Sequence, residues 1–192
     1  MRQWTWSAPL PNVTTYLLNS LNPFRLEGQK SIFLEAIQQR RWQVPDWVVL
    51  PGGNLGNVSA LGKAIREAYN AGLIDRMPRV AVVQAAGAAP FAAAFAGGFG
   101  SLEPVSAETV ASAISIGNPV NYAKAWRVIR ETEGLVLAVP DSELLDAKAS
   151  IDRVGIGCEP ASAPASPESS DLVRDGTIVA EGETVLTILT AI

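Results

Sequence analysis

The sequence predicts an α/β fold with a mainly parallel sheet of about four or five strands flanked by helices. Short apolar runs with the length of buried strands, such as residues 47–50, 80–83 and 135–139, alternate with longer stretches of helical periodicity. Turns rich in glycine or proline separate the two kinds of segment. Strands that alternate with helices usually pair in parallel, because each helix carries the chain back along the sheet.

Each remaining element follows from its own local pattern. The first helical stretch follows Pro23, and its apolar residues share one face up to Ile37. A second helix begins after the turn that ends the 47–50 strand, and its apolar residues recur at helical spacing from Val58 to Leu73. We further expect, in chain order, a short extended run at 14–18, a small-residue helix at 89–96, a helix from 118 to 130, a helix capped by Asp141, and a last strand at 185–189.

The composition is typical of a globular protein with its own core. The chain has 192 residues, of which 48% are hydrophobic and 18% charged. The net charge of −4 argues against nucleic acid or an anionic membrane as a partner. The longest uncharged stretch, residues 80–102, is interrupted by Gln84 and Pro90, so it predicts a packed strand and helix rather than a membrane span.

Two residue types narrow the chemistry further. The single cysteine, Cys158, allows no intrachain disulfide and favours a reducing, cytoplasmic compartment. The chain contains no histidine, which excludes serine–histidine or cysteine–histidine catalysis and histidine-ligated metals within it. We therefore expect no metal site.

The sharpest local motif is the sequence PGGNLGN at residues 51–57, between a predicted strand and a predicted helix. Glycines let backbone N–H groups approach a phosphate closely, and the start of the following helix adds further unpaired N–H groups. The spacing fits neither the dinucleotide G-x-G-x-x-G motif nor a Walker A loop, in which Ala64 would stand where Ser or Thr holds magnesium. From these residues alone, the motif is either a phosphate-binding turn or a structural tight turn.

Four sequence blocks, in this order, resemble the threonine synthases. The blocks are NSLNPFRLEGQK at 19–30, VPDW with PGGNLGNVSA at 44–60, IGNPVN at 116–121, and GCEPAS at 157–162. The resemblance covers about residues 14–190 and divides the chain into an unmatched segment, 1–12, and the C-terminal portion of an enzyme domain, 13–192. It implies the large-domain part of a fold-type-II pyridoxal-phosphate enzyme, similar to the tryptophan synthase β subunit.

The resemblance also implies an activity and a set of binding residues. Threonine synthases are lyases of threonine biosynthesis that convert O-phospho-L-homoserine and water into L-threonine and phosphate with pyridoxal 5'-phosphate. In this chain the cofactor phosphate would be held by Gly52, Gly53, Asn54, Leu55, Gly56 and Asn57. Thr190 would bond the pyridine nitrogen, and such a neutral hydroxyl partner leaves that nitrogen less strongly protonated than a carboxylate would.

The substrate phosphate would be held by Asn19, Ser20 and Arg25, with help from Asn57, as the resemblance implies. An arginine presents a planar set of donors that suits a phosphate dianion, while Asn and Ser donate without adding charge. Taken without the resemblance, Arg25 is better explained as a solvated arginine at the start of a helix.

The chain departs from the family in one decisive way. The family's Schiff-base lysine lies in a segment that reads roughly SFKDR, and none of Lys30, Lys63, Lys124 or Lys148 has that context. The family's upstream asparagine and its C-terminal Gly-His stretch have no counterpart either. We therefore assign no catalytic residue here and expect this fragment to be inactive alone.

Three interpretations remain open. The chain is a portion of a threonine synthase, or a non-catalytic α/β module that binds phosphate or a nucleotide, or a partial subunit. As a partial subunit it would pair with a chain that carries the N-terminal half and its lysine. A homodimer is a further expectation, and the partner of the site is a small phosphorylated amino acid.

Overall fold

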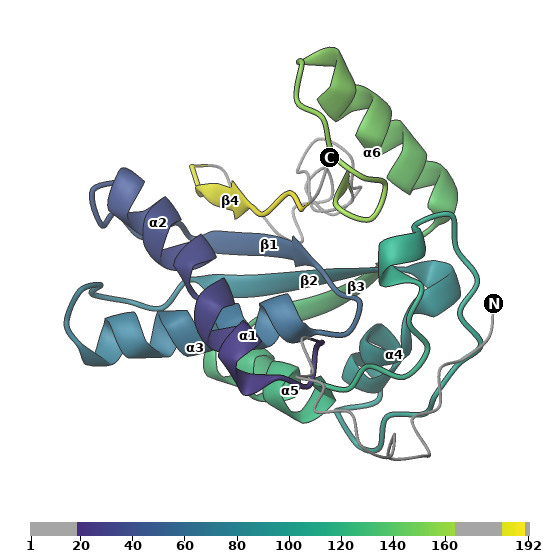
Figure 1. Ribbon diagram of the computed structural model, residues 1–192, viewed down its shortest axis with the longest axis horizontal. Helices are drawn as coiled ribbons and strands as arrows, with labels where there is room; N and C mark the ends of the chain where they lie inside the picture. The colour runs from purple at the N-terminus through teal and green to yellow at the C-terminus, as the bar shows by residue number, and fades with distance from the viewer. Residues whose placement is uncertain (1–18, 164–181, 191–192) are drawn as a thin grey trace, which may run out of the picture.

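The computed structural model describes residues 19–163 and 182–190, which form one sheet with helices on both of its faces (Figure 1). The four strands are β1 (Trp47–Pro51), β2 (Arg79–Ala85), β3 (Leu135–Val139) and β4 (Val185–Thr187). The helices are α1 (Pro23–Gln29), α2 (Ser31–Gln39), α3 (Gly56–Asn70), α4 (Pro90–Ala96), α5 (Tyr122–Glu131) and α6 (Asp141–Arg153), with 3-10 turns η1 (Ala86–Ala88) and η2 (Ser112–Ile114).

The strand order is β3–β2–β1–β4, and every pairing is parallel. Val49 of β1 stands opposite Ala81 of β2 on one side and Thr187 of β4 on the other. The predicted α/β class with a parallel sheet is therefore confirmed. The whole of β1 is buried, because strands pair with both of its edges and helices cover both of its faces.

Alternate residues of β1 enter two different cores, as the two-residue period of a strand requires. Val48 and Leu50 pack into the larger core with apolar residues of α2, α3 and α5. Trp47 and Val49 face the opposite side, where they pack in one cluster with Leu144 of α6. In Figure 1, α6 accordingly stands apart from α1, α3 and α5, with the strands between them.

The helical stretch after Pro23 is two helices rather than one. Asn22 caps α1 by accepting a hydrogen bond from Phe24 N–H at 2.9 Å, and α2 begins after Lys30. The helix predicted to run to Leu73 ends at Asn70, and Leu73 lies beyond it with 47% of its surface exposed. Gly72 has φ +69° and turns the chain away, which the spacing of apolar residues does not reveal.

Two boundary predictions are wrong in detail. Asp141 is the first residue of α6 rather than its cap, and its carboxylate accepts hydrogen bonds from Thr109 Oγ1 and Val110 N–H instead. The last strand stops at Thr187, so Thr190 lies in the segment after β4. The extended run expected at 14–18 lies outside the described residues. Among the described residues, no helix has the length and apolar character that crossing a bilayer needs.

The contact between α3 and α5 gives a first prediction. A Cβ at Gly62 of α3 would overlap the side chain of Val128 on α5, closer than real carbon atoms approach. We expect Gly62→Ala to lower the free energy of unfolding by about 1–3 kcal/mol. This loss would outweigh the helix propensity gained, which is about 1 kcal/mol. Urea denaturation measures it.

Gly28→Ala is the matched control, since nothing lies within 4 Å of a Cβ at that helical position. It should stabilise the protein by about 0.5–1 kcal/mol through helix propensity alone. Adding Val128→Ala to Gly62→Ala should cost less than the sum of the two single substitutions. Equal effects of the two glycine substitutions would contradict the close packing of α3 on α5.

Candidate functional site

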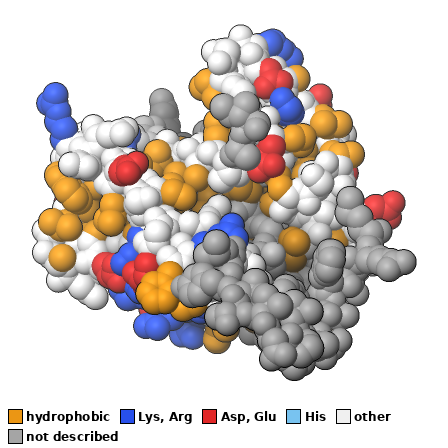
Figure 2. Space-filling view, in the orientation of Figure 1, with side chains coloured by type: hydrophobic (Ala, Val, Ile, Leu, Met, Phe, Trp, Pro, Cys, Tyr) orange, Lys and Arg blue, Asp and Glu red, His pale blue; other side chains and the backbone are white. Residues whose placement is uncertain are grey.

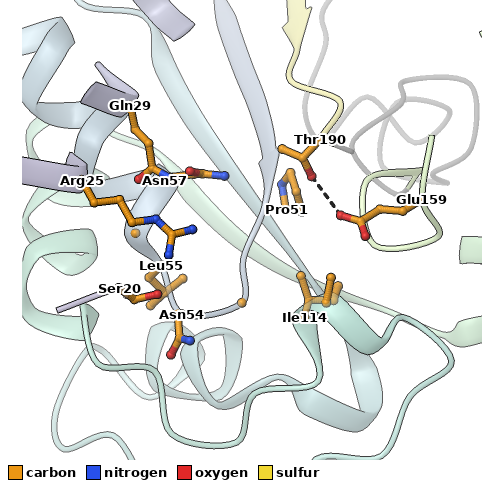
Figure 3. A pocket seen from close by; sticks show the side chains of 13 residues that line it. Ser20, Arg25, Gln29, Pro51, Asn54, Leu55, Asn57, Ile114, Glu159 and Thr190 are labelled. Carbon is orange, nitrogen blue, oxygen red and sulfur yellow. Dashed lines mark hydrogen bonds between the residues drawn. The ribbon is translucent and has the colours of Figure 1, made fainter. Parts of the chain in front are cut away.

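A cavity of about 410 Å³ lies beyond the carboxyl end of β1, where ligands bind in parallel α/β sheets. It is lined by α1 and the residue Ser20 before it, by the turn at residues 53–57, by η2, by Glu159 and by Thr190 (Figure 3). Five segments that are distant in the sequence therefore meet there. The volume is in the usual range for a small-molecule site, about 300–1,000 Å³.

Gly52 ends the hydrogen-bond ladder between β1 and β2. Its N–H donates to Val83 O at 2.8 Å, and its carbonyl accepts from Gln84 Nε2 at 2.8 Å. A Cβ at Gly52 would stand 2.5 Å from Val82 Cγ1, so only glycine fits. Gly52 does not line the cavity, and its role in the structure is to hold the turn against β2.

The rest of the turn presents backbone N–H groups without partners. Leu55 adopts a left-handed conformation with φ 61°, and α3 begins at the next residue, Gly56. Within the described residues, the N–H groups from Gly53 to Val58 donate to no protein acceptor. Unpaired N–H groups at a helix start, together with the positive end of the helix dipole, favour an anion. A tight turn with its N–H groups bonded internally would lack this property.

Arg25 supplies the positive charge of the cavity. Its side chain extends from α1 toward the space in front of the turn (Figure 3). Its guanidinium forms no ion pair with a described residue, whereas Lys30 and Lys63 on the neighbouring surface both pair with Glu27. An arginine on a cavity wall without a protein counter-ion suits an anionic ligand.

Ser20 lines the cavity and Asn19 does not. Asn19 Oδ1 accepts a hydrogen bond from Leu21 N–H at 2.9 Å, and its carbonyl accepts from Asn22 N–H at 3.1 Å. Both groups thus help to form the turn that leads into α1. The structure brings Ser20, Arg25 and Asn57 to one cavity and leaves Asn19 in the supporting turn.

Asn121 does not line the cavity but supports two segments that do, and the sequence patterns assign it no role. Its side chain is 3% exposed, and Nδ2 donates to Ser20 O at 3.0 Å and to Asn54 O at 3.2 Å. One amide therefore ties the segment before α1 to the glycine turn. The only sequence signal is its place in the block at 116–121.

Gln29 also lines the cavity without having been predicted. Its Oε1 is buried and has no hydrogen-bond partner among the described residues. A Cβ on Gly56 would lie 3.8 Å from that oxygen, which places the amide beside the start of α3. Buried acceptors are normally satisfied, so a donor from water or a ligand belongs here.

The opposite end of the cavity holds a network of hydroxyl and carboxylate groups. Thr190 Oγ1 lies 3.2 Å from Glu159 Oε1 and 2.6 Å from Ser162 Oγ, while Thr190 N–H donates to Ser162 Oγ at 2.9 Å. Figure 3 shows the Thr190–Glu159 bond facing the glycine turn across the cavity. Burial raises the pKa of the neighbouring Cys158 thiol, with a smaller contribution from the Glu159 charge, so the thiol is protonated at neutral pH.

None of the four lysines lines this cavity. Lys30 and Lys63 pair with glutamates of α1 and α3, Lys148 pairs with Asp152 within α6, and Lys124 Nζ donates to Asn121 Oδ1 at 3.4 Å. Over the described ranges, no three acidic or sulfur side chains come together as a metal site. The cavity therefore offers anion-binding groups and no amine.

Comparison with known proteins identifies the family of this chain. Residues 11–191 match the family described as "Pyridoxal-phosphate dependent enzyme". The chain is 45% identical over 177 residues to a threonine synthase of Methanosarcina acetivorans, covering 91% of this chain and 44% of the relative. It is 46% identical over 165 residues to that of Methanocaldococcus jannaschii, covering 85% and 41%. The chain thus spans less than half the length of these relatives.

Solved structures agree on the fold. Threonine synthase from Escherichia coli superposes with a TM-score of 0.67 at 22% identity, covering 91% of this chain and 39% of that one. An L-serine ammonia-lyase from Rhizomucor miehei gives 0.71 at 19% identity, covering 88% and 52%. At these identities the structures establish the fold alone. With the family match over nearly the whole sequence, the chain belongs to the pyridoxal-phosphate-dependent enzymes.

Proposed function

We propose that this chain forms the phosphate-binding portion of a threonine synthase active site, which converts O-phospho-L-homoserine and water into L-threonine and phosphate. The observation that carries the proposal is the pairing of two kinds of anion site in one cavity. Residues 53–57, whose N–H groups have no acceptor among the described residues, and Arg25, whose guanidinium forms no ion pair with them, both line it. A cofactor phosphate and a substrate phosphate need two such sites.

The residues present fit pyridoxal 5'-phosphate. The N–H groups of the glycine turn suit its phosphate, because they add no charge of their own and allow close approach. Thr190, at the other end of the cavity, suits the ring nitrogen as a hydrogen-bonding partner. Leu55 and Ile114 supply apolar wall between the two ends. When bound, the cofactor supplies an electron sink for carbanion chemistry at the substrate.

In this proposal the substrate phosphate is bound by Arg25, Ser20 and Asn57, which all line the cavity. Arg25 supplies a charge-assisted hydrogen bond, which is roughly twice as strong as a neutral one. Asn121 sets the spacing, because its amide bonds the carbonyls of both Ser20 and Asn54. The amine that holds the cofactor and moves protons would come from outside these 192 residues, in the part of the relatives' length that they do not cover.

A non-catalytic module that binds a phosphate or a nucleotide remains the second candidate. The favouring observation is that the cavity gathers anion-binding groups while no lysine of the chain lines it. The two candidates differ in whether a second polypeptide bearing the family's lysine segment confers turnover.

The two phosphate sites give separate binding predictions. Arg25→Gln should weaken binding of O-phospho-L-homoserine about tenfold or more, because it removes a charge-assisted hydrogen bond. Gly53→Val should abolish binding of pyridoxal 5'-phosphate, because a Cβ there already stands 3.2 Å from Ala113 O and the larger side chain crowds the turn. Isothermal titration of the folded chain measures both affinities.

Arg153→Gln is the charge-matched control, since Arg153 is exposed at the end of α6 and lies outside the cavity. It should leave both affinities unchanged. If Arg25→Gln weakens neither ligand more than Arg153→Gln does, the assignment of the substrate phosphate to Arg25 is wrong.

The lysines give a prediction about chemistry. The chain incubated with pyridoxal 5'-phosphate and then borohydride should show no stoichiometric label on any single lysine, because the cavity contains none. It should also release no phosphate from O-phospho-L-homoserine above background. Peptide mapping and a phosphate assay measure these outcomes.

Adding the lysine-bearing N-terminal portion of a related threonine synthase as a second polypeptide should restore phosphate release. Restoration should fail when Arg25→Gln is introduced into this chain. Turnover by this chain alone, with one of its four lysines labelled, would falsify the proposal that the amine comes from outside.

A further inference from the structure

The hydroxyl of Thr190 has more hydrogen-bonding neighbours than it has protons. Glu159 Oε1 lies 3.2 Å from Thr190 Oγ1, and Ser162 Oγ lies 2.6 Å from it. A threonine hydroxyl carries one proton, and an ionised carboxylate can only accept. The destination of that one proton decides what Thr190 can offer to a ligand in the cavity.

The two hydroxyl protons of Thr190 and Ser162 serve three contacts. The Thr190 proton goes to Glu159 Oε1, because a carboxylate can only accept. The Ser162 proton goes either to Thr190 Oγ1 or to the carbonyl of Thr190 at 2.8 Å. In both cases a protein acceptor takes the Thr190 proton. Oγ1 is then left with a lone pair, which is an acceptor, on the cavity side.

We propose that Glu159 and Ser162 make Thr190 Oγ1 a hydrogen-bond acceptor toward the ring nitrogen of the cofactor, and that Glu159 favours the protonated form of that nitrogen. Glu159 is thus a positioning residue that acts through Thr190. The inference rests on the proposed function, because it needs the ring to lie at this end of the cavity. A neutral hydroxyl alone is expected to leave the ring nitrogen less strongly protonated. The inference reverses that expectation, because this hydroxyl contacts a carboxylate.

Among the described residues, the Glu159 carboxylate is the charged group in contact with Thr190. It forms no ion pair with a described residue. Behind it, Lys148 is paired with Asp152 at 2.7 Å, and the Cys158 thiol is neutral because burial raises its pKa. Arg25, the cation on the cavity wall, lies at the phosphate end (Figure 3). An unpaired negative charge stabilises a nearby cation, here the protonated ring nitrogen.

The experiment uses pyridoxine 5'-phosphate labelled with 15N in the ring, which lacks the aldehyde and so forms no covalent bond to lysines. The pKa of the bound ring nitrogen is read from its 15N chemical shift as the pH is varied. Glu159→Gln should lower this pKa by on the order of one unit, because it removes the negative charge and keeps the shape. Glu35→Gln, which removes an exposed charge on α2, is the matched control and should leave it unchanged.

A double-substitution cycle separates this role from a merely structural one. In a Thr190→Val background, Glu159→Gln should change the ring pKa much less than it does in the native chain, because the connecting hydroxyl is gone. If the probe binds and Glu159→Gln shifts its pKa no more than Glu35→Gln does, the inference is wrong while the proposed function stands. If the chain binds neither pyridoxine 5'-phosphate nor pyridoxal 5'-phosphate, the proposed function fails and takes the inference with it.

Discussion

The hydrogen-bond ladder between β1 and β2 ends at Gly52, and the unpaired N–H groups of the cavity depend on that ending. Gly52 makes the last bond to Val83 O, and from Gly53 to Val58 the N–H groups have no acceptor among the described residues. A polar group that is buried without a partner costs about 1–3 kcal/mol. The turn is therefore stable only while its N–H groups face water or the oxygens of a ligand. Buried Gln84 holds it there, since one amide bonds both Gly52 O and the first N–H groups of α4.

The parallel strand order brings the two ends of the cavity together. β1 and β4 are neighbours and run in the same direction, so the glycine turn after β1 and Thr190 after β4 lie at the same edge of the sheet. The arginine-bearing segment reaches this edge by another route, through the bonds of Asn121 to Ser20 and Asn54. The pairing of β1 with β4 thus sets the distance between the glycine turn and Thr190. The side-chain amide of Asn121 sets the distance between the glycine turn and the segment before α1.

The strands and helices could be predicted from the sequence because their burial produces regular spacing of apolar residues. The turn could be predicted because its backbone geometry requires glycine. The hydrogen bonds between polar side chains of distant segments could not be predicted. Asp141 has the sequence pattern of a helix cap, yet its carboxylate bonds Thr109, 32 residues away. Asn121 and Glu159 lie in recognisable blocks, but their partners are far along the chain. Such roles are fixed by tertiary neighbours, which spacing does not encode.

The proposed function separates the groups that bind anions from the group that transfers protons. The groups that it assigns to the two phosphates are backbone N–H groups, an arginine and neutral side chains. The one ionisable group at the far end, Glu159, is engaged with Thr190. None of the four lysines lines the cavity: three pair with carboxylates, and Lys124 bonds Asn121 at 3.4 Å. Under the proposed function this cavity orients two phosphates and a ring, and the proton transfers fall to a group outside the described residues.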